Sequence, residues 1–333
     1  MNLDINIITA DATHSGSIKR IISDIYEPVM KSNIKKFGPE ISKGLDKRWQ
    51  MPDYSTVSSK NEILVAVVDK RVVGFTAYRV VNDILITDCA MTDTEYKTDE
   101  VSGALYSATL KKAKDIGCKY AKVHTVLDEA YSHVYGNYKE AGYKSRLESV
   151  MYYMPLSQRT QNRINNNVVI VPASDMHVED VMKITVSAWT PIRLEQKRLL
   201  GDTLYKRFFD GWEERKCLEV KDDFLASGKD GTFGYTALMD GKVAGFVTRL
   251  RSTSVPYMGI IGNNAVDPAY SGKGIGGAMH SYIIGEMEKE GMTHVGVFTG
   301  CDYAHAPARR AYEKVGFDIE SAVICADNYV FIE

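Results

Sequence analysis

The pattern of apolar and polar positions predicts two helices that resemble each other. Apolar side chains recur at spacings of three and four between Ala10 and Pro28, which is typical of a helix with one buried face. The same spacing returns between Ala173 and Pro191. Each stretch follows a short run rich in β-branched residues, at 5–9 and at 168–171. We therefore expect a strand before each helix.

A second pair of segments predicts two similar hairpins. The sequence AVVDKRVVGF at 66–75 parallels ALMDGKVAGF at 237–246, and each is typical of a strand, a two-residue turn and a strand. Asp240-Gly241 is a strong hairpin signal, whereas Asp69-Lys70 is a weaker one.

The third repeated segment is the longest. Residues 93–123 align without a gap on residues 267–297, and the same register places YKEAGY at 138–143 on YEKVGF at 312–317. A register held over about fifty residues indicates an internal duplication. Each half is expected to alternate strands and helices, which makes the fold class α/β.

The boundary between the two copies is predicted from composition. The stretch from Pro155 to Asn167 is polar, rich in Asn and Gln, and without apolar periodicity. We therefore predict an N-terminal domain at 1–156, a linker at 157–167 and a C-terminal domain at 168–333.

Composition and charge exclude several classes of function. The chain has 333 residues, 44% hydrophobic and 25% charged, which suits two ordinary globular domains. Its formal net charge is −2, so there is no overall basic field to attract nucleic acid or anionic lipid. We expect neither of these partners.

The cysteines and the N-terminus bear on the compartment. The five cysteines are scattered without a C-x-x-C pair, which argues against a zinc site or a disulfide framework. The N-terminus lacks the features of a signal peptide, and no apolar run approaches the roughly 18 residues of a membrane helix. We expect a cytoplasmic protein without a bound metal, as a monomer or a homodimer.

A glycine-rich loop is the main chemical signal. It joins a predicted buried strand at 257–266 to a predicted helix at 278–290, and it reads Ser271-Gly272-Lys273-Gly274-Ile275-Gly276-Gly277. Its four glycines would let several backbone N–H groups converge on one point. The adjoining helix N-terminus adds unpaired donors and a positive dipole end. The loop therefore predicts a phosphate-binding site.

Other interpretations of the loop remain open. GKGIGG matches the dinucleotide fingerprint G-x-G-x-x-G, and Asp302 follows the next strand. However, five residues separate the strand end from Gly272, and only 31 residues follow Asp302, too few for the rest of a doubly wound sheet. A Walker A loop would need Ser or Thr after Lys273. A plain structural turn is the remaining alternative.

Two motifs at matching spacing resemble the GCN5-related N-acetyltransferase (GNAT) superfamily. The stretch VDPAYSGKGIG at 266–276 is similar to its Gln/Arg-x-x-Gly-x-Gly/Ala loop, and HAPARRAYEKVGF at 305–317 to its second signature. The resemblance implies two tandem domains, each a mostly antiparallel, splayed sheet flanked by helices. It implies acetyl-CoA, or another short acyl-CoA, as co-substrate. Two positions depart from the family pattern: Ser271 stands for Gln or Arg, and His305 for Asn.

The resemblance also implies roles for individual residues. Tyr312 would lie near the coenzyme A sulfur as general acid, with an ordinary phenol pKa near 10. The backbone of Ala265 and Val266 would line the pantetheine, with His305 as a further contact. The remaining cofactor-binding residues would be those of the loop: Ser271, Gly272, Lys273, Gly274, Ile275, Gly276 and Gly277. No base is evident, although Asp302 and Glu219 are possible substitutes.

The N-terminal copy lacks the glycine loop. Its aligned residues are Lys97-Thr98-Asp99-Glu100-Val101-Ser102-Gly103, so three glycines are replaced and two carboxylates would face a phosphate. Such contacts cost on the order of a few kcal/mol. We expect one acyl-CoA site per chain and an enzyme that acylates an amine of unknown identity. The alternatives are a non-catalytic coenzyme A-binding or scaffold protein, and a nicotinamide-dependent enzyme.

Overall fold

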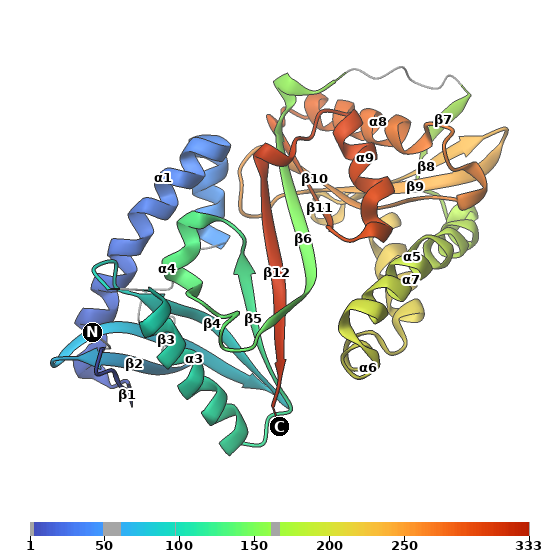
Figure 1. Ribbon diagram of the computed structural model, residues 1–333. Helices are drawn as coiled ribbons and strands as arrows, with labels where there is room; N and C mark the ends of the chain where they lie inside the picture. Colours follow the sequence, from blue (N-terminus) through green and yellow to red (C-terminus); the bar gives the residue numbers. More distant parts are fainter. Residues whose placement is uncertain (1–2, 49–60, 97, 161–166, 333) are drawn as a thin grey trace. The chain divides into compact units, whose positions relative to one another are not determined.

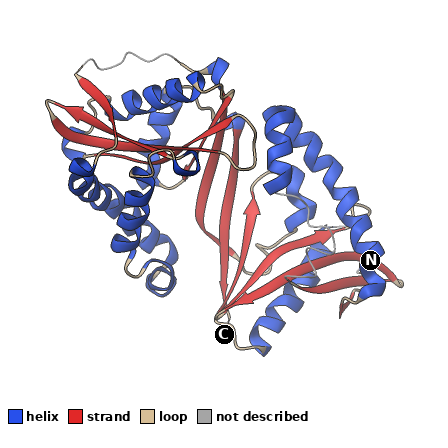
Figure 2. Cartoon of the chain, turned by 180° about the vertical axis from the view of Figure 1, so that it is seen from behind, coloured by secondary structure: helices blue, strands red, loops and turns tan. Residues whose placement is uncertain are grey.

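The computed structural model describes residues 3–48, 61–96, 98–160 and 167–332. The chain forms two compact units (Figure 1). Unit 1 comprises residues 1–148 and 323–333, and unit 2 comprises residues 149–322. Each unit contains a mixed, mostly antiparallel sheet with helices packed against it (Figure 2). The α/β fold class predicted from the sequence is confirmed.

In the part of the chain that the structure describes, unit 1 holds six strands in the order β1-β2-β3-β4-β5-β12. Only β4 and β5 pair in parallel. The strands are β1 (Asn6–Thr9), β2 (Glu62–Val68), β3 (Arg71–Val81), β4 (Ile84–Thr92), β5 (Tyr120–Val126) and β12 (Ala322–Phe331). The helices are α1 (Ser15–Arg48), α3 (Thr98–Asp115) and α4 (Ser132–Tyr135).

Unit 2 repeats this arrangement, in the order β7-β8-β9-β10-β11-β6. Here β10 and β11 are the parallel pair. The strands are β6 (Lys144–Pro155), β7 (Val168–Pro172), β8 (Phe233–Met239), β9 (Lys242–Arg251), β10 (Met258–Val266) and β11 (His294–Gly300). The helices are α5 (Val178–Leu200), α6 (Asp202–Phe209), α7 (Trp212–Phe224), α8 (Ile275–Lys289) and α9 (Ala306–Lys314).

Both predicted hairpins form at the predicted positions. Asp69 and Lys70 join β2 to β3, and Asp240 and Gly241 join β8 to β9. All four residues have positive φ, between 49° and 72°, as a tight two-residue turn requires. The weaker Asp69-Lys70 signal therefore gives the same turn without a glycine.

The last strand of each half lies in the sheet of the other unit. Strand β12 ends the C-terminal half but pairs with β5 of unit 1, with Cys325 opposite Val126. Strand β6 ends the N-terminal half, and its residues 149–155 pair with β11 of unit 2. The sequence prediction divided the chain at 156 and 168, whereas the compact units divide at 148 and 322. Of the predicted linker 157–167, residues 161–166 lie outside the described residues.

The sheet of unit 2 separates two sets of helices. Phe246 and Ala265 pack against Val181 of α5 and Phe224 of α7 in one apolar cluster. On the opposite face, Gly245 lies close to Met279 of α8, and α8 contacts α9. Adjacent residues of β10 therefore point alternately toward α5 and α7 or toward α8 and α9.

Candidate functional site

The candidate site lies where β10 and β11 stop pairing. Their parallel register runs from Met258–His294 to Ile261–Val297 and no further. Beyond it, β10 pairs only with β9, across an irregularity between Ile261 and Asn264. The parallel strands of unit 1 also stop pairing partway, at Thr87–Val123. The splayed pair that the resemblance implied is thus present in both units.

The register of β10 determines which amides point toward the unpaired side. Asp267 donates a backbone hydrogen bond to Ala244 at 3.0 Å. Because hydrogen-bonded and non-hydrogen-bonded pairs alternate in an antiparallel ladder, the N–H of Ala265 is directed at Phe246 on β9. The N–H of Val266 then points away from β9. Ala265 and Val266 were both predicted to face the pantetheine through their backbone, but only the N–H of Val266 points away from β9.

The glycine loop has the backbone geometry expected of a phosphate cradle. Gly272 and Gly274 adopt φ values of 78° and 77°, a region that side chains disfavour. A Cβ atom at either position would meet no other atom within 4 Å, so the space beside both is open. Gly274 is the N-cap of α8, and its first turn holds no acidic residue.

Five amides at this helix start lack an acceptor within the described chain. The first hydrogen bond of α8 is donated by Ala278 to the Gly274 carbonyl at 3.0 Å. The amides that precede it and donate to no described residue are those of Gly272, Gly274, Ile275, Gly276 and Gly277. Together with the positive end of the helix dipole, they suit the phosphates of coenzyme A.

Tyr312 projects from α9 into a buried polar group. Its side chain is 3% exposed. Its hydroxyl lies 3.1 Å from Nδ2 of Asn264 and 3.4 Å from Oδ1 of the same amide. Nε2 of His280, on α8, lies 3.2 Å from that Oδ1. Burial raises the pKa of Tyr312 to about 12, so the phenol is protonated at neutral pH.

His305 and Asp302 form a local pair at the start of α9. Nδ1 of His305 lies 2.7 Å from Asp302, and the His305 amide donates to the same carboxylate at 3.1 Å. These interactions outweigh burial and lower the pKa of Asp302. Asp302 is therefore a weak base that orients His305, which makes it a poorer candidate for the catalytic base.

Carboxylates gather on the opposite face of β10. Nδ2 of Asn263 donates to Asp223 at 2.8 Å and to Glu219 at 3.2 Å, both on α7. Nζ of Lys216 donates to Oδ1 of Asn263 at 2.7 Å and lies 4.9 Å from the centre of the Trp189 ring. Burial raises the pKa of Asp223. The sequence offered two possible bases: Glu219 lies on this face of β10, whereas Asp302 lies beside His305.

Sequence reasoning identified Tyr312 but missed the residues that contact it. Asn264 and His280 are isolated polar residues in predicted elements. The duplication holds a signal for them, because the aligned positions of the N-terminal copy are Ala90 and Tyr106. Asp223 was also missed, although it is four residues after Glu219 and so lies on the same helix face.

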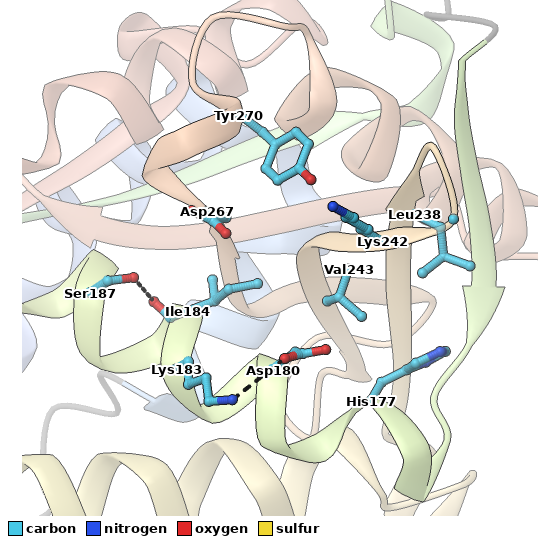
Figure 3. A pocket seen from close by; sticks show the side chains of 11 residues that line it. His177, Asp180, Lys183, Ile184, Ser187, Leu238, Lys242, Val243, Asp267 and Tyr270 are labelled. Carbon is cyan, nitrogen blue, oxygen red and sulfur yellow. Dashed lines mark hydrogen bonds and ion pairs between the residues drawn. The ribbon is translucent and has the colours of Figure 1, made fainter.

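A surface cleft of about 560 Å³ lies beside the start of the glycine loop (Figure 3). Lys242 and Tyr270 line it together with residues of α5 such as Asp180 and Lys183. None of the predicted cofactor-binding residues lines this cleft, although Tyr270 immediately precedes Ser271. Lys273 reaches back over the Tyr270 ring, 4.8 Å from its centre.

The equivalent loop of unit 1 carries side chains at three of the four glycine positions. Asp99 and Glu100, which align with Lys273 and Gly274, lie in the first turn of α3. Ser102, which replaces Gly276, accepts a hydrogen bond from the Asn137 amide at 2.9 Å. Lys97 lies outside the described residues.

Two other kinds of site are absent among the described residues. They include no group of three or more His, Cys, Asp or Glu side chains placed to bind a metal ion. No helix among them is long and apolar enough to cross a membrane.

Part of the chain matches a protein-family model. Residues 199–317 match the family model of the acetyltransferase (GNAT) family. Comparison with the curated proteins finds no match.

Solved structures with the same fold are similar along nearly the whole chain. A GCN5-related N-acetyltransferase from Sphaerobacter thermophilus is 13% identical, with a TM-score of 0.55 over 99% of this chain and 96% of that one. A glucosamine N-acetyltransferase region of a fungal multi-domain β-N-acetylglucosaminidase is also 13% identical, with a TM-score of 0.52, over 99% of this chain and 38% of that one. Residues 199–317 are therefore similar to the acetyltransferase (GNAT) family, and the chain has the fold of solved GCN5-related N-acetyltransferases.

Proposed function

We propose that this protein transfers an acyl group, most simply acetyl, from coenzyme A to an amine in unit 2. The observation that carries the proposal is the row of five unpaired amides at the glycine loop, beside the unpaired end of β10. This loop fits the diphosphate of coenzyme A, and Val266 offers an N–H to the pantetheine or the thioester carbonyl.

The two faces of β10 supply the two proton transfers. The acceptor nitrogen attacks the thioester carbon, the carbon–sulfur bond breaks, and the products are an amide and coenzyme A. Tyr312, on one face, gives its proton to the sulfur as the carbon–sulfur bond breaks, and takes a proton back from water afterwards. Asp223, on the other face, accepts the proton that the amine loses. Glu219 and Asp223 also favour a cationic acceptor.

Calorimetry with coenzyme A is expected to give one equivalent bound per chain, because α8 begins at a glycine loop with unpaired amides, whereas the aligned loop at α3 carries Asp99 and Glu100. Mixing the protein with acetyl-CoA, a panel of primary amines and a thiol reagent should then show thiol release that depends on an amine. Tight binding without release across the panel would favour a non-catalytic coenzyme A-binding protein. NADH binding without coenzyme A binding would overturn the proposal in favour of a nicotinamide enzyme.

Asp223→Asn should lower the transfer rate on the order of 100-fold, as expected for loss of a general base. Only the ionised carboxylate accepts a proton, and burial raises the pKa of Asp223. The rate of the parent protein should therefore fall as the pH drops toward this raised pKa, above the usual aspartate range. The variant should lose that dependence. Asp222→Asn, at the exposed neighbouring position, is the control, and equal rates for both variants would exclude Asp223 as the base.

A further inference from the structure

The hydroxyl of Tyr312 has two possible hydrogen-bond directions, and only one leaves its proton available. It can accept from Nδ2 of Asn264 at 3.1 Å, or donate to Oδ1 of the same side chain at 3.4 Å. In the first arrangement the O–H can point away from Asn264. In the second, the amide oxygen holds the proton that a leaving thiolate would need.

The orientation of the Asn264 amide is fixed by the backbone. Its Nδ2 lies 2.9 Å from the carbonyl oxygen of Gly262, which is part of the irregular stretch of β10. With the amide turned over, two carbonyl oxygens would face each other at this distance, and neither could donate. Nδ2 therefore faces Gly262 and Tyr312, and Oδ1 faces His280.

The amide orientation in turn selects the tautomer of His280. Its Nε2 lies 3.2 Å from Oδ1 of Asn264, and an amide oxygen only accepts. Nε2 must therefore carry the imidazole proton. Burial lowers the pKa of His280 to about 4, so the ring is neutral at neutral pH and holds this single proton. Oδ1 then already accepts one hydrogen bond from His280, which weakens its competition for the Tyr312 proton across the longer distance of 3.4 Å.

We propose that His280 and Asn264 are positioning residues that keep the Tyr312 proton directed away from Asn264 and available to the leaving group. This inference rests on the proposed function. His280 donates to Asn264, Asn264 donates to Tyr312, and the Tyr312 hydroxyl is left as a donor. No proton moves along this series of hydrogen bonds, because the role of His280 is to compete with Tyr312 for the Asn264 oxygen.

The N-terminal copy shows that the fold does not require this arrangement. Tyr138 aligns with Tyr312, but Ala90 and Tyr106 stand at the positions of Asn264 and His280. Tyr106 is buried and donates instead to the backbone of Tyr135 at 2.7 Å. The tyrosine persists in unit 1 without the amide and the imidazole, alongside a loop in which Asp99 and Glu100 replace Lys273 and Gly274.

The first test is nuclear magnetic resonance of the full chain with ¹⁵N-labelled histidine, in which His280 is assigned by comparison with His280→Gln. We expect the Nε2-protonated tautomer for His280. The Nδ1-protonated tautomer would overturn the inference, because Nε2 would then accept and the amide would turn its oxygen toward Tyr312. This result does not depend on any enzymatic activity.

The second test separates positioning from folding and from the proposed function. His280→Leu should lower thiol release from acetyl-CoA about tenfold with unchanged coenzyme A affinity. His280→Gln, which restores a donor near Nε2, should recover most of that loss. In a Tyr312→Phe background, His280→Leu should cause no further loss. Additive losses, or equal rates for Leu and Gln at 280, would overturn the inference. If Tyr312→Phe itself left the rate unchanged, the failure would lie in the proposed general acid instead.

Discussion

Substitution of Gly274 by glutamate is expected to abolish coenzyme A binding. Gly274 caps α8 with φ 77°, where a side chain costs roughly 1–2 kcal/mol. The added carboxylate would stand at the helix N-terminus, where the diphosphate is proposed to bind, and like-charge contact costs a further few kcal/mol. The strain destabilises the free and the bound protein alike, so the charge contact alone predicts the loss of affinity, on the order of 100-fold or more. Titration calorimetry with coenzyme A measures it.

The matched control is Gly291→Glu, just beyond the other end of the same helix. Gly291 has φ 80°, and a Cβ atom added there would meet no other atom within 4 Å, so the backbone strain and the added charge are the same. Thermal unfolding should shift at least as far downward for Gly291→Glu, because its carboxylate meets the negative end of the helix dipole, whereas affinity should fall only for Gly274→Glu. Unchanged affinity in Gly274→Glu would show that coenzyme A does not use this loop.

The N-terminal copy already carries this substitution. Glu100 is the residue that aligns with Gly274, and it lies in the first turn of α3. A glutamate there stabilises the helix start through the dipole, which removes the need for an external anion. The comparison of the two loops therefore supports a single coenzyme A site, in unit 2.

Local patterns were sufficient for the elements and the duplication. The three- and four-residue spacing in 173–191 becomes α5, and the Asp240-Gly241 turn forms as expected. The glycine loop also lies between a strand and a helix as predicted, although α8 begins three residues before the predicted Ala278. These features are set by neighbours along the chain, and their signals are therefore present in short windows of sequence.

Short windows of sequence could not predict that β12 pairs with β5 and that β6 pairs with β11. Strand β12 has the pattern of a buried strand, and nothing in that pattern distinguishes β5 from β11 as its partner. The partner is selected by residues about 200 positions away, such as Lys122 and His124, whose side chains bond Asp327 at 2.9 and 2.8 Å. Because the two halves are similar, β5 and β11 offer similar strand edges, and the sequence pattern alone does not decide which of them β12 pairs with.

The side-chain contacts of the site were only partly predictable. Tyr312 and the loop follow from motifs, and their roles stay predictions. Asn264 and His280 contact Tyr312 from a different strand and a different helix, so no spacing brings them together. A position-by-position comparison of the two copies would have identified Asn264 and His280 as differences, because Ala90 and Tyr106 stand at the aligned positions.

Tyr312→Phe should lower the rate of acyl transfer about 100-fold or more, the usual range for loss of a general acid. Coenzyme A affinity should change little, because the ring still packs between His280 and Phe317. Because its pKa is raised to about 12, the phenol does not ionise near pH 10 as an ordinary tyrosine would. Its contribution should therefore persist through about pH 10 and disappear only as the pH approaches the raised pKa.

Tyr138→Phe in unit 1 is the matched control, since Tyr138 is the aligned and buried tyrosine of the other copy. It removes the same hydroxyl from the same fold without touching the proposed site, so the transfer rate should stay at the parent value. Rates should be measured at saturating acetyl-CoA across pH 6 to about 10, where the parent phenol stays protonated. A loss that also appeared in Tyr138→Phe would indicate damage to the fold. A loss confined to Tyr312→Phe assigns the proton to Tyr312, because thiolate departure is the step that requires an acid.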